Sequence, residues 1–225
     1  MTKPTKLCEC WYKDVCEQHH DDCRQGCLEY KEMLYLMSHS NIPPRLQKPL
    51  PLMIPKSDTS AYNRLTEIKQ DMRSFVRGGN SLYICSTTTG NGKTTWALKL
   101  LMRYFEEIKT GNCFRVRGVF VPTEEFLLRN KDFKNNDPEL EDLKDAIKTA
   151  DLVVWDDIGS ANSTAYDYNT MLMYLDIRDR DGLSNIFTSN HIDMESLGAH
   201  VGVKCASRIF TKNTEVIQFV GRDRR

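Results

Sequence analysis

A glycine-containing loop, Thr87–Thr94, lies between an apolar segment and a helical one. The apolar segment, residues 81–85, has the short length and the composition of a buried strand. From Lys93 to about Ile108 the sequence is typical of a helix. A strand, a loop that contains Gly-x-Gly-Lys-Thr and a helix, in this order, form the context that a phosphate-binding loop requires.

Strands and helices alternate through residues 61–225. The segment Leu152–Trp155 is apolar throughout, as expected for a strand that is covered on both faces. The alternation predicts an α/β domain with a mostly parallel sheet. Besides the elements named above, strands are expected over residues 114–121, 152–155, 185–188 and 215–220, and helices over residues 61–77, 123–130, 138–150, 168–180 and 200–210.

A proline-rich stretch divides the chain. Five of the eight prolines fall between Pro43 and Pro55. Because proline removes a backbone donor and fixes φ, this stretch suits neither a helix nor an inner strand. We therefore expect an extended linker over residues 42–60, between an N-terminal module of residues 1–41 and a larger domain of residues 61–225.

Charge and hydropathy exclude several classes of protein. Lys plus Arg and Asp plus Glu each total 31, so the formal net charge is zero and a polycation that coats nucleic acid is excluded. The apolar runs fall far short of the ~20 residues that a membrane span needs. The N-terminal sequence has no apolar segment of a secretory signal. We expect a cytoplasmic protein with no membrane partner.

The loop Thr87–Thr94 has the chemistry of a nucleotide phosphate site. Its small residues let consecutive backbone N–H groups surround a phosphate chain, and the helix N-terminus adds positive potential. Lys93 is expected to reach the β- and γ-phosphates, and the Thr94 hydroxyl to hold Mg²⁺. Thr87 departs from the usual motif, which has glycine at this position. The residues expected to bind ATP are Thr89, Gly90, Asn91, Gly92, Lys93, Thr94, Thr95 and Asp156.

Two carboxylates, Asp156 and Asp157, follow the apolar segment at 152–155. Asp156 is expected to hold Mg²⁺ together with Thr94, and Asp157 to orient or deprotonate the attacking water. The alternative is an ordinary strand that ends in two turn-forming aspartates, but the presence of the phosphate-binding loop favours catalysis. Asp157 is one methylene shorter than a glutamate, which predicts slow turnover.

Further polar residues lie nearer the C-terminus. Asn190 follows the expected strand at 185–188 and would touch the γ-phosphate or the attacking water; a simple turn is the alternative. Arg208 lies on a short helical segment, from which it would stabilise phosphoryl charge in a neighbour's site; the alternative is a surface ion pair. The tail Gly221–Arg225 holds three arginines. The alternative to a functional role for them is a frayed basic end of the chain.

Five of the eight cysteines fall within the first 27 residues. In a reducing compartment this clustering indicates a metal site instead of disulfides. After the cysteines, the same module contains apolar residues at helical spacing: Tyr30, Met33, Leu34 and Met37. We expect part of this stripe to pack on the metal site and the rest to contact a partner helix. The alternative for the cysteines is that they are reduced and unligated. The expected zinc ligands are Cys10, Cys16, Cys23 and Cys27, with Cys8, His19 and His20 as substitutes.

The order of these motifs resembles that of AAA+ ATPases of the DnaC/DnaI helicase-loader type, over residues 61–225. The resemblance is carried by the phosphate-binding loop, Leu-Val-Val-Trp-Asp-Asp-Ile-Gly, Phe-Thr-Ser-Asn, Ser-Arg-Ile and Gly-Arg-Asp-Arg-Arg. The related IstB transposition ATPases share much of this core. The resemblance implies a P-loop core with no lid domain, preceded in the sequence by a small Cys-rich helical module. The roles it implies are Walker A for Lys93 and Thr94, Walker B for Asp156 and Asp157, sensor 1 for Asn190, a trans arginine finger for Arg208 and a sensor 2-like role for Arg225.

The resemblance also implies an ATP-dependent loader that places a hexameric replicative helicase on single-stranded DNA. Its N-terminal module would hold the helicase, and ATP would drive self-assembly through the trans arginine finger. Lys131, Phe133 and Lys134 are weak candidates for contacts with single-stranded DNA. Two alternatives stay open: an IstB-like transposition helper, and a zinc-dependent nucleotide-binding interaction protein without turnover.

Overall fold

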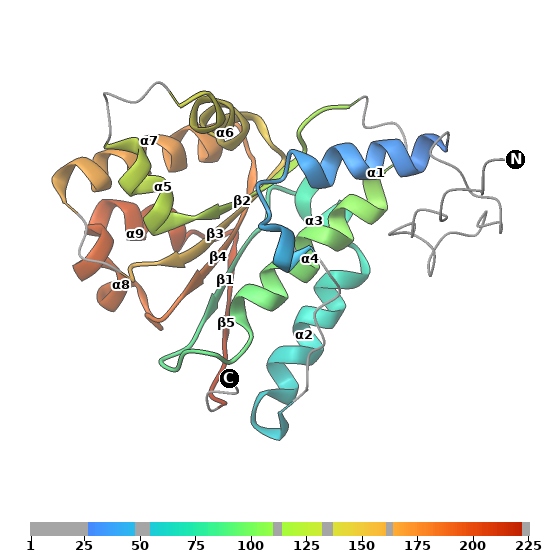
Figure 1. Cartoon of the computed structure of the whole chain (residues 1–225). Helices are drawn as coiled ribbons and strands as arrows, with labels where there is room; N and C mark the ends of the chain where they lie inside the picture. Colours follow the sequence, from blue (N-terminus) through green and yellow to red (C-terminus); the bar gives the residue numbers. More distant parts are fainter. Residues whose placement is uncertain (1–26, 48–54, 110–113, 132–136, 161–163, 222–225) are drawn as a thin grey trace, which may run out of the picture.

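The computed structural model describes residues 27–47, 55–109, 114–131, 137–160 and 164–221. Within these ranges, parallel strands form one sheet in the order β2-β3-β4-β1-β5 (Figure 1). The α/β domain with a parallel sheet is therefore confirmed. The strands are β1 (Ser81–Cys85), β2 (Gly118–Pro122), β3 (Leu152–Ile158), β4 (Ser184–Ser189) and β5 (Thr214–Gln218).

Helices cover both faces of the sheet (Figure 1). The first four lie on one face and the other five on the opposite face. The described residues include no helix with the length and apolar character of a membrane span. The helices are α1 (Leu28–Ser38), α2 (Thr59–Gln70), α3 (Met72–Arg77), α4 (Lys93–Ile108), α5 (Thr123–Asn130), α6 (Pro138–Thr149), α7 (Ala165–Arg180), α8 (Met194–Val201) and α9 (Val203–Ile209), with 3-10 turns η1 (Pro44–Leu46) and η2 (Lys56–Asp58) before α2.

Alternate side chains of each strand enter two separate cores. In β1, Leu82 and Ile84 pack with α1–α4, whereas Tyr83 and Cys85 pack with α5–α9. The other inner strands divide in the same way, because successive side chains of a strand point to opposite faces. Both faces are buried, and this explains the unbroken apolar run of β3 in the sequence.

Helix α1 belongs to the core that contains α4. Met33, Leu36 and Met37 are buried there, while Leu34 leaves 47% of its surface exposed. The expected apolar stripe of this helix therefore has Met33 and Met37 on the buried face. Among the described residues this face packs on the α/β domain, and packing of the helix on a metal site or on a partner helix stays a prediction.

The segment that follows α1 protects an edge of the sheet. Phe120 N donates a hydrogen bond to the Ser40 carbonyl at 2.7 Å, and the Asn41 side chain donates to the Phe120 carbonyl at 2.8 Å. Because β2 is the outermost strand, these bonds cover backbone groups that could otherwise pair with another chain. Residues 28–41 are thus attached to the α/β domain, and the separate module stays a prediction for residues 1–26, outside the described part.

Two strand boundaries differ from those expected by three or four residues. The strand predicted from residue 114 begins at Gly118, because Phe114 has a φ of 52°, in the left-handed region that a strand excludes. β3 continues past Trp155 to Ile158, so it includes the two carboxylates that were expected to follow it.

Two predicted helices are each divided by one residue. The helix expected over residues 61–77 breaks at Asp71, whose carboxylate accepts a hydrogen bond from Ser74 N at 3.0 Å and caps α3. The helix expected over residues 200–210 is two helices, because Gly202 has a φ of 84° between α8 and α9.

The attachment of α1 can be tested by comparing two leucines on this helix. We expect Leu36→Ala to lower the free energy of unfolding by about 2–5 kcal/mol, because Leu36 is 1% exposed and its removal leaves a cavity. Leu34→Ala, the control on the exposed face, should change it by no more than about 0.5 kcal/mol. Urea unfolding of the full chain measures both. An unchanged midpoint for Leu36→Ala would show that α1 is not part of the core.

Candidate nucleotide-binding site

The carboxyl ends of β1, β3 and β4 meet at one cavity of about 390 Å³. In open parallel sheets, ligands bind outside the carboxyl ends of the strands. All eight residues that were expected to bind nucleotide line this cavity, as do both residues expected to act on the γ-phosphate or water. The described lining is Thr89, Gly90, Asn91, Gly92, Lys93, Thr94, Thr95, Asp156, Asp157, Thr188 and Asn190.

The loop after β1 has a conformation that depends on two glycines. Gly90 and Gly92 have φ values of 68° and 96°, where a Cβ atom would be strained. Gly92 is the N-cap of α4, so the first turn of that helix, whose N–H groups have no intrahelical acceptor, lines the cavity. Thr87 is exposed and its φ is not positive. The departure from glycine at Thr87 therefore causes no backbone strain.

The loop is also fixed by residues distant in sequence. Thr88 Oγ1 donates a hydrogen bond to the Gly221 carbonyl at 2.7 Å, and Asn91 Nδ2 donates to Thr88 Oγ1 at 3.1 Å. Gly221 N donates in turn to the buried Asp58 carboxylate at 3.0 Å. This chain of bonds connects the start of α2, the end of the described chain and the phosphate-binding loop.

The ammonium group of Lys93 is buried among acceptors at the centre of the loop. Nζ donates to the Thr88 carbonyl at 3.0 Å and to Asn190 Oδ1 at 2.9 Å. The other end of the Asn190 amide donates to Asp157 Oδ1 at 3.2 Å. Asn190 thus joins the cation that would bind phosphate to the carboxylate that would orient water, and its contact with the γ-phosphate or the attacking water stays a prediction.

Asp156 connects the phosphate-binding loop to β4. Its Oδ1 accepts hydrogen bonds from Thr94 Oγ1 at 2.8 Å and from Thr188 Oγ1 at 2.7 Å. Burial raises the pKa of this carboxyl above its usual value, against the opposing effect of the two hydroxyls and of Lys93. A hydroxyl and a carboxylate oxygen in contact are the donor set that Mg²⁺ prefers. Thr94 and Asp156 would hold this ion, which would supply charge neutralisation for the phosphates.

An irregularity in β3 brings both carboxylates to the same cavity. Successive side chains of a regular strand point to opposite faces. Between Trp155 and Ile158 the register with β4 shifts, and Asp157 has a φ of 56°. Its backbone N–H donates to Thr188 Oγ1 at 2.8 Å. Asp156 and Asp157 therefore both line the cavity, at the cost of a left-handed backbone at Asp157.

Comparisons with known proteins bear on the fold of the chain. No protein-family model and no curated protein sequence matches the chain. Among solved structures, DnaI is 20% identical with a TM-score of 0.61, over 82% of this chain and 94% of DnaI. The DnaC helicase loader is 18% identical with a TM-score of 0.59, over 77% of this chain and 94% of the loader. AMPPCP-bound DnaA from Aquifex aeolicus is 15% identical with a TM-score of 0.56, over 76% and 50%.

The chain has a fold similar to those of DnaI and of the DnaC helicase loader. At these identities the likeness concerns the fold, so the chemistry of the site rests on the contacts of this chain's own side chains.

The two predicted arginines have different outcomes. Arg208 lies on α9, where its side chain is half exposed and Nε forms an ion pair with Asp176 of α7 at 2.5 Å. It does not line the cavity of its own chain, and its action on a neighbour stays a prediction. Arg225 lies outside the described residues.

The expected zinc ligands are mostly outside the described residues as well. This holds for Cys10, Cys16 and Cys23, while Cys27 is an exposed free thiol. The described part of the chain contains no group of three or more His, Cys, Asp or Glu side chains that could hold a metal ion. Of the weak DNA candidates, Lys131 forms an ion pair with Asp167 at 2.8 Å, and residues 133 and 134 are not described.

Sequence reasoning missed Thr188, although this residue fixes both carboxylates. Its hydroxyl donates to Asp156 and accepts from the backbone of Asp157. A signal was present, since the strand ends in Thr-Ser-Asn and only Asn190 was selected from it. Thr188 points to the site edge of β4 because it alternates with the buried Phe187.

The metal role of Asp156 can be tested through thermal stability. Without ligand, the raised pKa means that the folded protein holds this proton more tightly than the unfolded chain, so stability falls as pH rises through the pKa of Asp156. Asp156→Asn keeps an oxygen acceptor for both threonine hydroxyls and removes the charge. We expect the ligand-free variant to be at least as stable as the wild type at neutral pH and to lack this pH dependence.

The same variant should lose the stabilisation that Mg²⁺ adds to ATP binding. Mg-ATP at 100 times its Kd would stabilise the wild type by about 2.7 kcal/mol in total, and the variant should gain less. Thermal unfolding with ATP, in Mg²⁺ and in chelator, measures this difference. Asp157→Asn is the matched control, since it removes an adjacent charge but leaves both expected Mg²⁺ ligands. If Asp156→Asn retained the full Mg²⁺-dependent shift, the metal assignment would be wrong.

Proposed function

We propose that this chain binds and hydrolyses ATP and that it loads a hexameric replicative helicase onto single-stranded DNA. The observation that carries the proposal is the contact of Asn190 with both Lys93 and Asp157, in an AAA+ fold like those of DnaI and the DnaC helicase loader. This arrangement couples a phosphate-binding cation to a carboxylate that can accept a proton from water.

The chemistry follows from charges that are already in position. Lys93 would exchange its contact with Asn190 for the β- and γ-phosphate oxygens, and the first turn of α4 would donate N–H groups to the same phosphates. Asp157 would then orient the attacking water, with Asn190 holding the water or the γ-phosphate from the opposite side. Because Asp157 is shorter than glutamate and fixed by a strained backbone, we expect slow turnover that a partner stimulates.

Assembly of two subunits would supply a further positive charge to the nucleotide site of one of them. Arg208 is exposed on α9, and its ion pair with Asp176 is also exposed, so little is lost when the guanidinium leaves it for a neighbour's phosphates. Met173 on α7 and Val203 on α9 are exposed apolar residues of the same two packed helices, with 46% and 69% of their surface accessible. These features support contact with a second subunit at this face.

The remaining parts of the proposal rest on the sequence. Zinc binding by Cys10, Cys16, Cys23 and Cys27, and the helicase grip of the N-terminal module, concern residues that are almost all outside the described part. The Cys-rich segment is the feature that favours a loader over an IstB-like transposition helper. Cytoplasmic location and single-stranded DNA as a partner belong to the same proposal.

Helicase loading gives the decisive test. In a reaction with the helicase of the same organism, circular single-stranded DNA and Mg-ATP, the wild type should deposit helicase on the DNA. Lys93→Ala should reduce this at least about tenfold, since one charge-assisted contact to phosphate is worth more than 1.4 kcal/mol. Lys99→Ala is the control on the same helix, because Lys99 does not line the cavity. Wild-type loading by Lys93→Ala would refute an ATP-driven loader, and absence of any helicase complex would favour the transposition alternative.

The trans role of Arg208 can be tested by mixing two inactive variants. Arg208→Ala retains its own Lys93 and Asp157, whereas Asp157→Asn retains its own Arg208. Each variant alone should lack partner-stimulated ATP hydrolysis. In a mixture, an intact site of the first variant would receive an arginine from the second, so part of the phosphate release should return. No recovery in mixtures, with both variants folded and helicase-bound, would show that Arg208 does not act in trans.

A further inference from the structure

A second, smaller hollow lies on the other side of Asp157 from the nucleotide cavity. It has a volume of about 90 Å³ and is enclosed by α5, the end of β3 and α7. Asp157 lines both this hollow, here called the α5–α7 pocket, and the nucleotide cavity. The described lining of the α5–α7 pocket is Thr123, Glu124, Leu127, Leu128, Lys131, Asp157, Ile158, Gly159, Ser160, Asp167, Tyr168, Met171 and Val201.

Two polar side-chain atoms of this pocket are buried without a hydrogen-bond partner among the described residues. They are the hydroxyl oxygen of Thr123 and Oδ1 of Asp167, in side chains that are 5% and 3% exposed. A buried acceptor that stays unpaired costs about 1–3 kcal/mol, and more when it is charged. Both atoms therefore favour a ligand with hydrogen-bond donors.

The carboxylate of Asp167 is already a cation site through its other oxygen. Oδ2 accepts from Lys131 Nζ at 2.8 Å and from the backbone N–H and hydroxyl of Thr164, each at 2.7 Å. Burial alone would raise the pKa of Asp167, but Lys131 and Thr164 lower it below its usual value, so the group is ionised near neutral pH. Oδ1 remains as an acceptor without a hydrogen-bond partner, on a residue that lines the pocket.

The charge of the pocket excludes phosphate and favours a cation. Its described acidic and basic residues are three carboxylic acids, Glu124, Asp157 and Asp167, and one base, Lys131. A nucleic-acid backbone would meet a net negative surface here. The pocket therefore differs in kind from the adjacent nucleotide cavity, where Lys93 and the helix N-terminus favour anions.

The walls define the shape of the ligand. Leu127, Met171 and Val201 are buried apolar residues, and Leu128 at the same pocket leaves 59% of its surface exposed. Tyr168 adds an aromatic side chain to the lining. A side chain with an apolar stem and a flat donor group that contacts an aromatic ring matches this surface, and only arginine combines these features.

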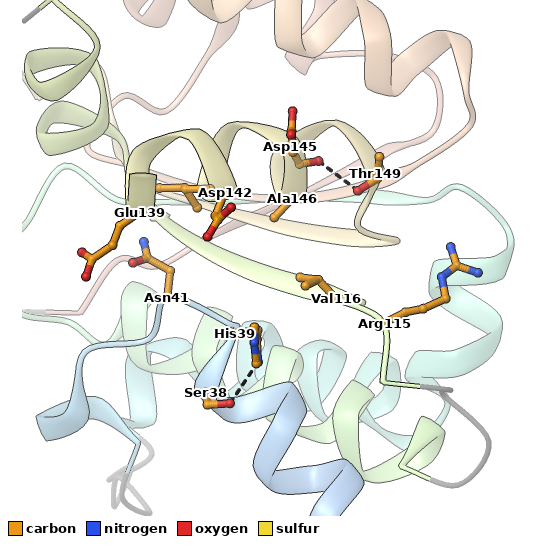
Figure 2. Close-up of a pocket in the computed structure, with 11 residues that line it drawn as sticks. Ser38, His39, Asn41, Arg115, Val116, Glu139, Asp142, Asp145, Ala146 and Thr149 are labelled. Atoms are coloured by element: carbon orange, nitrogen blue, oxygen red, sulfur yellow. Dashed lines mark hydrogen bonds between the residues drawn. The ribbon is translucent and has the colours of Figure 1, made fainter. Parts of the chain in front are cut away.

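A larger groove elsewhere does not have these properties. It measures about 690 Å³ between the end of α1 and α6, and Figure 2 shows Glu139 and Asp142 on one side with His39 and Asn41 on the other. Its described lining contains no buried side-chain atom that lacks a hydrogen-bond partner. An acidic groove of this kind attracts cations without selecting one, so it does not compete with the α5–α7 pocket for a specific side chain.

We propose that the α5–α7 pocket receives an arginine side chain from a protein partner. The guanidinium would donate to Asp167 Oδ1 and to Thr123 Oγ1, and its stem would lie against Leu128 and Met171. Because Asp157 is shared with the nucleotide cavity, the bound cation would act on the carboxylate that orients water. This last consequence rests on the proposed ATPase function, whereas the binding of arginine does not.

The test uses n-butylguanidinium as the ligand and the full chain labelled with ¹³C at the methionine methyl groups, without nucleotide. The Met171 signal is assigned with Met171→Leu. We expect it to shift saturably with n-butylguanidinium and not with n-butylurea, which has nearly the same shape and no charge. Asp167→Asn should weaken binding about tenfold, as expected for loss of a charge-assisted hydrogen bond.

Thr123→Val keeps the test valid if Asp167→Asn disturbs the start of α7. It removes a buried hydroxyl that has no partner, so the fold should tolerate it. We expect Thr123→Val to weaken n-butylguanidinium binding a few-fold, which is less than Asp167→Asn does, because Thr123→Val removes no charge. Equal shifts with n-butylurea, wild-type affinity in both variants, or a shift of Met171 by oligo(dT) would each overturn the proposal. None of these readouts depends on ATP binding, so a failed ATPase assay would leave them unaffected.

Discussion

The carboxylate of Asp156 is the contact on which the candidate site depends. One oxygen accepts from Thr94, directly after the phosphate-binding loop, and from Thr188 at the end of β4. Three chain segments that lie 32 residues or more apart are thereby held at one point. Partial burial disfavours the ionised form of Asp156, and this raises the pKa of its carboxyl. A divalent cation would offset that cost, which supports the proposed role of Asp156 as a Mg²⁺ ligand.

The second carboxylate, that of Asp157, has a strained backbone, whereas that of Asp156 is partly buried. Asp157 is exposed, yet its backbone has a left-handed φ of 56°, which is costly for a residue with a side chain. Hydrogen bonds from Asn190 and to Thr188 maintain this conformation. The strain places Asp157 at the wall between the nucleotide cavity and the α5–α7 pocket.

The sequence predicted the elements that carry local signals and missed those decided by distant contacts. β1 and α4 were predicted at their observed bounds, because the loop between them requires a strand before it and a helix after it. The strand expected from residue 114 began too early, since apolar composition does not reveal the left-handed backbone at Phe114. Gly202 was a readable signal for the break between α8 and α9, but helical spacing continued across it. The lining of the nucleotide cavity was predicted except for Thr188, whose role depends on the neighbouring strand.

The residues before the α/β domain are less separate from the nucleotide site than a proline-rich linker suggests. The Asp58 carboxylate accepts hydrogen bonds from the backbone of Val220 and Gly221, and the Gly221 carbonyl accepts from Thr88 of the phosphate-binding loop. These contacts are buried or partly buried, so solvent does not screen them fully. The segment immediately before α2 is therefore connected through Gly221 to the loop that would bind phosphate, so the position of that loop depends on contacts outside the α/β domain expected from the sequence.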